Sequence, residues 1–99
     1  MANQAQRHFV YILQCADGVF YVGATEDLES RVAMHNEGRG PKFTACRLPV
    51  TLLYPEEHDS MSEARQREIQ IKKWSRAKKE AFIAGNRSRL HELSKRRGR

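Results

Sequence analysis

Two short apolar and aromatic runs on either side of an Asp-Gly pair place the strongest constraint on the fold of this chain. The first run reads HFVYILQC (8–15) and the second reads VFYVG (19–23), with Ala16, Asp17 and Gly18 between them. β-Branched and aromatic residues favour strands, and Asp-Gly favours the tight turn of a hairpin. The pattern therefore predicts two antiparallel strands joined by a short turn.

The segment after the hairpin predicts a helix, because Thr25 or Asp27 can cap its start and Gly38 can end it. A loop rich in glycine, proline and basic residues follows over 38–49. β-Branched and aromatic residues return over 50–57 and predict a third strand.

The C-terminal third of the chain predicts helices. Ser60 and Glu63 match a capping box, so a long helix is expected from about 61 to 84, with Gly85 as its stop. A short helix is expected around 87–95. The order strand, strand, helix, strand, helix, helix predicts an α/β or α+β fold in which helices flank a small three-stranded antiparallel sheet.

The length of 99 residues fits one domain. We expect it to span 8–94, between a flexible N-terminus (1–7) and a basic, disordered tail (95–99). The chain has no apolar run near the roughly 20 residues that span a membrane, and its start does not match a signal peptide. These features predict a cytoplasmic protein, in which Cys15 and Cys46, which lack metal-site spacing, are free thiols.

The charge of the chain is divided unequally along its length. Residues 65–99 contain 13 Lys or Arg against 3 Asp or Glu, whereas residues 1–64 contain 5 against 9. A strongly basic half indicates a polyanionic partner, and a solvated helix face with a basic tail is the alternative. Nucleic acid is favoured over membrane because the basic segment lacks a long apolar face.

The expected long helix carries a carboxylate on its apolar side. At 100° per residue, one broad stripe contains Met61, Ala64, Ile71, Trp74 and Phe82. Glu68 falls within that stripe, where a carboxylate costs free energy unless it is paired or bound to a metal. Two readings remain open: a Glu68 paired with Arg31 or lying at the edge of the stripe, or a ligand of a hard cation such as Mg²⁺.

These residues resemble the signature of the GIY-YIG nuclease superfamily, in particular its small stand-alone bacterial members. The first signature triplet is Phe9-Val10-Tyr11, and the second is Tyr21-Val22-Gly23. An Arg (Arg31) and a His (His35) one turn apart and a later Glu (Glu68) complete the pattern. The chain departs from it at Phe9, where the family pattern has glycine, and this affects local strand geometry more than chemistry.

The resemblance implies a metal-dependent endonuclease that hydrolyses phosphodiester bonds in DNA. Either Tyr11 or Tyr21 would act as general base, and the other would hold a water, the phosphate or the water shell of the metal. Arg31 would bind the scissile phosphate, and His35 would orient the tyrosine or share the base role. Glu68 would hold one Mg²⁺ or Mn²⁺ that stabilises the leaving oxygen.

The substrate-binding residues are less well defined. The expected set is Gly23, Arg39, Lys42, Thr44, Arg47, Lys72, Lys73 and Asn86. Contacts of basic residues with the backbone give affinity without sequence preference, and Gly23 has a simpler reading as a turn residue with positive φ. We therefore expect low sequence specificity or selection of DNA structure, in repair or DNA turnover, with a targeting partner protein as one option.

The alternative is a non-catalytic nucleic-acid-binding module with the same fold, for which structured RNA is one candidate ligand. Glu68 separates the two readings, because binding alone does not need an inward carboxylate whereas a nuclease needs its metal. The pattern leaves open which tyrosine is the base and how many chains assemble.

Overall fold

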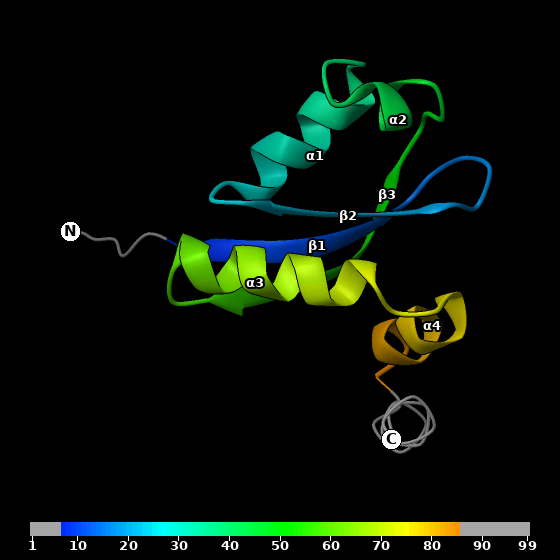
Figure 1. Cartoon of the computed structure of the whole chain (residues 1–99). Helices are drawn as coiled ribbons and strands as arrows, with labels where there is room; N and C mark the ends of the chain where they lie inside the picture. The colour runs from blue at the N-terminus through cyan, green and yellow to red at the C-terminus, as the bar shows by residue number, and fades with distance from the viewer. Residues whose placement is uncertain (1–6, 86–99) are drawn as a thin grey trace.

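The computed structural model describes residues 7–85, which form a three-stranded antiparallel sheet with helices on both faces (Figure 1). The strands are β1 (His8–Gln14), β2 (Phe20–Thr25) and β3 (Thr51–His58), in the spatial order β2-β1-β3. The helices are α1 (Leu28–Asn36), α2 (Lys42–Ala45), α3 (Met61–Lys72) and α4 (Arg76–Ile83). The predicted fold class and element order are confirmed, and α2 is a one-turn addition within the predicted loop.

The predicted hairpin is confirmed. The amide of Cys15 donates to the carbonyl of Val19 (2.8 Å), and Gly18 occupies the turn with a positive φ of 88°. β1 and β2 pair in a register that places Tyr11 opposite Gly23 and Leu13 opposite Tyr21. Cross-strand partners share a face of the sheet, so Tyr11 of the first triplet lies directly beside Gly23 of the second, and Tyr21 is a diagonal neighbour of Tyr11 on the same face.

Alternate side chains of β1 enter two separate cores. Val10 and Ile12 pack on the face that is covered by α3 and α4, where they meet Ile71. Tyr11 and Leu13 point to the opposite face, which lies under α1 (Figure 1). This alternation follows from the period of two in a strand, and it separates the tyrosine face from the α3 face.

Pro55 lies within β3, which continues to His58. Pro55 lacks the amide hydrogen that a central strand would need. Among the described residues, however, β3 is an edge strand with a strand partner on one side only, so proline is tolerated there.

The predicted continuous helix over 61–84 is wrong, because α3 and α4 are separate helices. The hydroxyl of Ser75 accepts a hydrogen bond from the amide of Lys78 (3.1 Å) and begins α4 as its N-cap. Serine favours such caps over helix interiors because its side chain competes for backbone groups. The break leaves Trp74 and Phe82 buried together, with ring centroids 5.1 Å apart, so the predicted apolar stripe is kept although the helix is interrupted.

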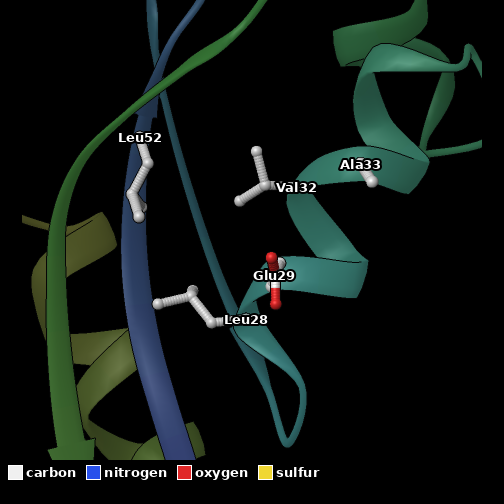
Figure 2. A pocket seen from close by; sticks show the side chains of 5 residues that line it. All are labelled: Leu28, Glu29, Val32, Ala33 and Leu52. Carbon is white, nitrogen blue, oxygen red and sulfur yellow. The ribbon is translucent and has the colours of Figure 1, made fainter.

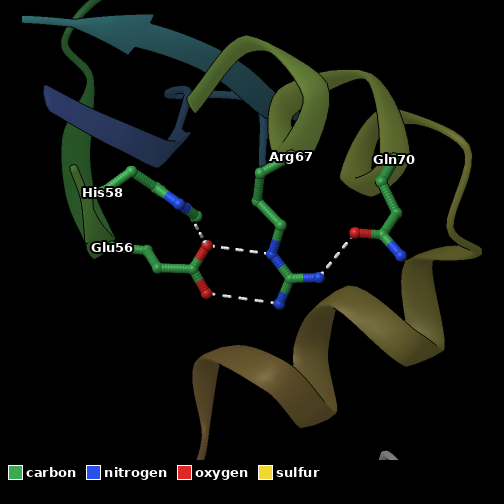
Figure 3. Close-up of polar contacts among 4 residues, drawn as sticks. All are labelled: Glu56, His58, Arg67 and Gln70. Carbon is green, nitrogen blue, oxygen red and sulfur yellow. Dashed lines mark hydrogen bonds and ion pairs between the residues drawn. The ribbon is translucent and has the colours of Figure 1, made fainter. Parts of the chain in front are cut away.

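A polar network joins β3 to α3 (Figure 3). The guanidinium of Arg67 donates to both carboxylate oxygens of Glu56, at 2.9 and 3.2 Å, and to Gln70 at 2.7 Å. His58 contacts the same carboxylate at 2.7 Å. Arg67 also lies 5.1 Å above the centroid of the Trp74 ring. One side chain thus ties β3 to the junction of α3 and α4.

Several expectations fall beyond this part of the chain. The short helix at 87–95, the tail at 95–99 and Asn86 lie outside the described residues, as does most of the N-terminal segment 1–7. Within residues 7–85, the two cysteines are free thiols. No helix in the same range has the length and apolar character to span a bilayer.

Candidate active site

Tyr11 lies at the centre of the site, and its hydroxyl is hydrogen-bonded to His35. β1 directs the Tyr11 side chain under α1, where only 1% of the residue is exposed. Its hydroxyl oxygen is 3.1 Å from Nε2 of His35, which is fully buried on the inner face of α1. Asp27 fixes the start of α1, because its carboxylate accepts from the amide of Ser30 (3.1 Å). Of the two predicted caps, Asp27 is therefore the one that caps α1.

The other nitrogen of His35 fixes the direction of this hydrogen bond. Nδ1 is 2.9 Å from the hydroxyl of Thr44, and that hydroxyl donates to the carbonyl of Pro41 at 3.1 Å. A hydroxyl has one hydrogen, so Nδ1–H of His35 donates to Thr44. Nε2 of the neutral ring is then the acceptor for the hydroxyl of Tyr11. We call Tyr11, His35 and Thr44 the relay.

Two glycines leave the space that the relay occupies. A Cβ on Gly23 would lie 2.5 Å from the hydroxyl oxygen of Tyr11, and one on Gly40 would lie 2.6 Å from Nδ1 of His35. Gly23 is in β2 and does not have the positive φ of a turn residue. Its place in the signature therefore has a steric reason, since any side chain at Gly23 would displace the ring of Tyr11.

Tyr21 connects the relay with the surface. It is partly exposed, and its ring centroid is 6.4 Å from that of Tyr11 and 5.3 Å from that of His35. On its other side it contacts Phe43 of α2, at 6.0 Å between centroids. The two tyrosines therefore have different environments, and Tyr21 is the one that meets solvent.

Burial and neighbouring charges set the proton affinities in the relay. Burial raises the pKa of Tyr11 to about 12, the adjacent Tyr21 adds to the rise, and the charge of Arg31 opposes it. Burial also lowers the pKa of His35, and Arg31 lowers it further. Arg31 therefore acts on both groups, and His35 is held in the neutral form that the relay requires.

Glu68 approaches from the opposite face of the sheet. Its side chain on α3 is 12% exposed, and its carboxylate contributes a small rise to the pKa of Tyr11. Lys72 pairs with it at 3.0 Å and Arg65 at 3.5 Å, so its partners are neighbours on α3 and not Arg31. Residues 7–85 hold no group of three or more potential metal-ligating side chains. One fixed carboxylate fits Mg²⁺, which usually keeps several waters and binds substrate phosphates.

The residues expected to contact substrate differ in their exposure and in their ion pairs. Lys42 and Lys73 are exposed. Arg39 pairs with Glu37 at 2.6 Å, and Lys72 is the partner of Glu68. Thr44 is fully buried and holds His35, so the structure places it within the relay and away from a backbone phosphate.

The structure adds two residues to the site that the sequence interpretation missed, Gly40 and Phe43. Both belong to the predicted loop, in and around α2. Pro41 at the start of α2 is a helix-start signal. A helix of one turn is too short, however, for apolar periodicity to reveal which side chains face inward.

A separate cavity lies between α1 and β3 (Figure 2). Its volume is about 510 Å³, and its lining residues are Leu28, Glu29, Val32, Ala33 and Leu52. The labelled side chains in Figure 2 belong to α1 and β3, and none of them is part of the relay. Its mainly aliphatic wall has no cation for a phosphate, so we do not count it as part of the candidate site.

Comparison with known proteins gives one consistent family. Residues 7–81 match the GIY-YIG catalytic domain. A UPF0213 protein of Halobacterium salinarum is 54% identical over 76 residues, which cover 77% of this chain and 99% of that protein. A UPF0213 protein of Staphylococcus saprophyticus is 46% identical over 78 residues, which cover 79% and 95%.

Two solved structures are also similar. The solution NMR structure of a UPF0213 protein from Bacillus halodurans is 39% identical, with a TM-score of 0.53, and the match covers 81% of this chain and 85% of that one. The solution NMR structure of a protein from E. faecalis is 38% identical, with a TM-score of 0.56, and covers 86% and 90%. The resemblance inferred from the sequence is thereby confirmed.

Proposed function

The chain belongs to the GIY-YIG family, a nuclease superfamily, and from this premise we propose that it is a metal-dependent endonuclease acting on DNA. The proposed reaction is phosphodiester hydrolysis with low sequence specificity or with selection of DNA structure, serving repair or turnover. The observation that carries the proposal is the relay, which gives a buried tyrosine a proton acceptor beside the charge of Arg31.

In the proposed mechanism Tyr11 is the general base. The hydroxyl proton of Tyr11 passes to Nε2 of neutral His35 as the tyrosine oxygen accepts a proton from the attacking water. Thr44 holds the His35 ring in the tautomer that can accept this proton. Tyr11 is preferred to Tyr21 because it has the hydrogen-bonded acceptor, whereas Tyr21 is better placed to contact the substrate.

Charge on the phosphate is the second requirement. The planar guanidinium of Arg31 suits the bidentate geometry of phosphate oxygens, and its field already reaches both Tyr11 and His35. Glu68 would hold a single Mg²⁺ or Mn²⁺, which would neutralise charge on the leaving oxygen. The pairing with Lys72 keeps the Glu68 carboxylate in one position.

The test is a cleavage assay on supercoiled plasmid with Mg²⁺, Mn²⁺ or EDTA. Tyr11→Phe is expected to reduce cleavage at least about 100-fold, the scale of general acid–base catalysis. Glu68→Gln is expected to reduce it at least as much, because it removes the carboxylate that would hold the metal. Tyr54→Phe and Glu63→Gln are matched controls, because Tyr54 packs on the other face of the sheet and Glu63 is exposed on α3. Undiminished cleavage by Tyr11→Phe would contradict the assigned base.

A non-catalytic nucleic-acid-binding module is the second candidate. It is favoured by the raised pKa of Tyr11 and by the two cations that already neighbour Glu68. It predicts binding of nucleic acid without cleavage in either metal, and equal binding by wild type, Tyr11→Phe and Glu68→Gln.

A further inference from the structure

Phe43 presents an aromatic ring to solvent at the rim of the candidate site. Phe43 is 40% exposed, and among the described residues the other large exposed apolar side chain is Ile69 of α3, at 55%. The ring of Phe43 lies beside that of Tyr21, with 31° between the two planes. The guanidinium of Arg47 lies 4.1 Å above its centroid.

The orientation of this ring is fixed from two sides. Its neighbour in α2, Thr44, is fully buried and bonded to His35. Arg47 donates to the backbone carbonyl of Phe43 at 2.9 Å and to the carboxylate of Asp17 in the hairpin turn at 3.1 Å. The side chain of Thr44 therefore lies in the relay, and that of its neighbour Phe43 lies at the surface, where Arg47 holds it in place.

We propose that Phe43 and Arg47 form a stacking platform for an unpaired nucleobase of DNA beside the scissile phosphate, so that the site prefers single-stranded segments to intact duplex. The proposal rests on the proposed function and specifies its substrate. In a duplex each base is covered on both faces, whereas an unpaired base can stack on an aromatic side chain or an arginine plane. The arginine strengthens the platform through its cation–π contact.

The location of the platform agrees with this role. Tyr21 lies between Phe43 and the relay, with centroid distances of 6.0 Å to Phe43 and 5.3 Å to His35. A nucleotide with its base on Phe43 would therefore have its phosphate near the relay. Lys42 is exposed and adjacent in sequence, where it can meet the backbone of the same strand.

The test measures binding by fluorescence anisotropy in EDTA, with a labelled single strand and a blunt duplex of the same sequence. Phe43→Leu keeps an apolar side chain but removes the ring, and it is expected to weaken single-strand binding about ten-fold and duplex binding less than about two-fold. Phe43→Trp should retain single-strand binding. Ile69→Ala removes a comparably exposed apolar group from α3 and should change neither.

Single strands with one abasic position, stepped along the sequence, identify the stacked base. At one position the abasic substitution should weaken binding to wild type about ten-fold but have little further effect on Phe43→Leu. A loss in Phe43→Leu that is equal for single strand and duplex, or no loss at all, would overturn the platform. Thermal unfolding of each variant shows whether a loss of binding reflects a loss of fold.

The proposed function and the platform can fail separately. Binding to single strands that depends on Phe43, without cleavage in Mg²⁺ or Mn²⁺, would support the platform and contradict the nuclease. Cleavage that depends on Tyr11 but is the same for both DNA forms and unaffected by Phe43→Leu would support the nuclease and contradict the platform.

Discussion

At the scale of single residues, the site depends on what Gly23 and Gly40 lack. Each glycine lies where a Cβ would come within 2.6 Å of a relay atom. Real Cβ contacts are not this short, so a side chain at either position forces Tyr11 or His35 to move. The positions of the relay side chains are therefore encoded partly by residues with no chemistry of their own.

Gly23→Ala is expected to destabilise the protein by about 1–3 kcal/mol, because the added methyl overlaps the ring of Tyr11. Urea unfolding measures this change, and cleavage should fall with it as the bond from Tyr11 to His35 lengthens. In a Tyr11→Ala background the same substitution should cost nothing or stabilise, since a strand interior disfavours glycine. An equal cost in both backgrounds would show that the overlap is not the cause.

The second residue-scale prediction concerns pH. The pKa of His35 in the folded protein is below its ordinary value of 6.5, because burial and then Arg31 disfavour its cation. Between that lowered value and 6.5 the unfolded chain binds more protons, so the free energy of unfolding should fall as pH falls below about 6.5. Urea midpoints between pH 7.5 and 5 measure this, and His35→Gln should flatten the decline.

The pH range of that experiment avoids the titration of a second group, the carboxylate of Glu56. Burial would raise the pKa of Glu56, but hydrogen bonds and charge from Arg67 and His58 outweigh it, and the pKa lies below 4.5. The stability that Glu56 contributes is therefore present above 4.5 and is lost at lower pH. A decline that persists unchanged in His35→Gln above pH 5 would assign the titration to a different group.

At the scale of elements, the junction of α3 and α4 is stabilised by specific contacts and not by helix propensity. Ser75 ends the continuity of the two helices and caps the second one. Arg67 then joins this junction to β3 through its hydrogen bonds with Glu56 (Figure 3). The guanidinium of Arg67 also lies above the ring of Trp74. The position of α4 therefore depends on the planar guanidinium of Arg67, which binds both carboxylate oxygens of Glu56.

Arg67→Lys is expected to destabilise the protein by about 1–2 kcal/mol, because lysine keeps the charge but loses the paired hydrogen bonds and most of the stacking. Arg65→Lys is the matched control on the same helix. The side chain of Arg65 is 63% exposed, so its replacement should change stability by less than about 0.5 kcal/mol. Equal urea midpoints for the two variants would contradict the role of Arg67.

At the scale of the whole molecule, the relay and the excess of basic residues lie in different parts of the chain. The acidic N-terminal part, residues 1–64, contains the relay and Arg31, whereas the excess of basic residues begins at 65, in α3. Glu68 comes from the basic part and the tyrosines come from the acidic part. Because the relay and α3 lie on opposite faces of the sheet, a polyanion bound to both parts would have to pass around an edge of the sheet.

Binding to DNA should therefore weaken at least about ten-fold between 50 and 200 mM salt, as phosphate contacts release counterions. Lys42→Gln should lower the slope of log affinity against log salt by about one, for single strands and duplex alike. Arg7→Gln is the control, because Arg7 is exposed just before β1 and already pairs with Glu57 at 3.5 Å. A flat salt response would exclude DNA as the ligand.

The sequence by itself determined the local features of this protein. Asp17-Gly18 predicted the hairpin, and Ser60 predicted the start of α3, where its hydroxyl accepts a hydrogen bond from the amide of Glu63 (3.1 Å). The signature pattern also named Tyr11, Tyr21, Arg31, His35 and Glu68. Each of these inferences depends on neighbouring residues or on a spacing that can be read along the chain.

Only the tertiary structure decided how these residues act together. Tyr11 and His35 are 24 positions apart, and His35 and Thr44 are 9 apart. Their hydrogen bonds exist because α1 and α2 pack against one face of the sheet at a distance that Gly23 and Gly40 allow. The buried position of Thr44 and the exposed ring of Phe43 have the same origin, since packing between distant segments sets their environments and no local pattern specifies it.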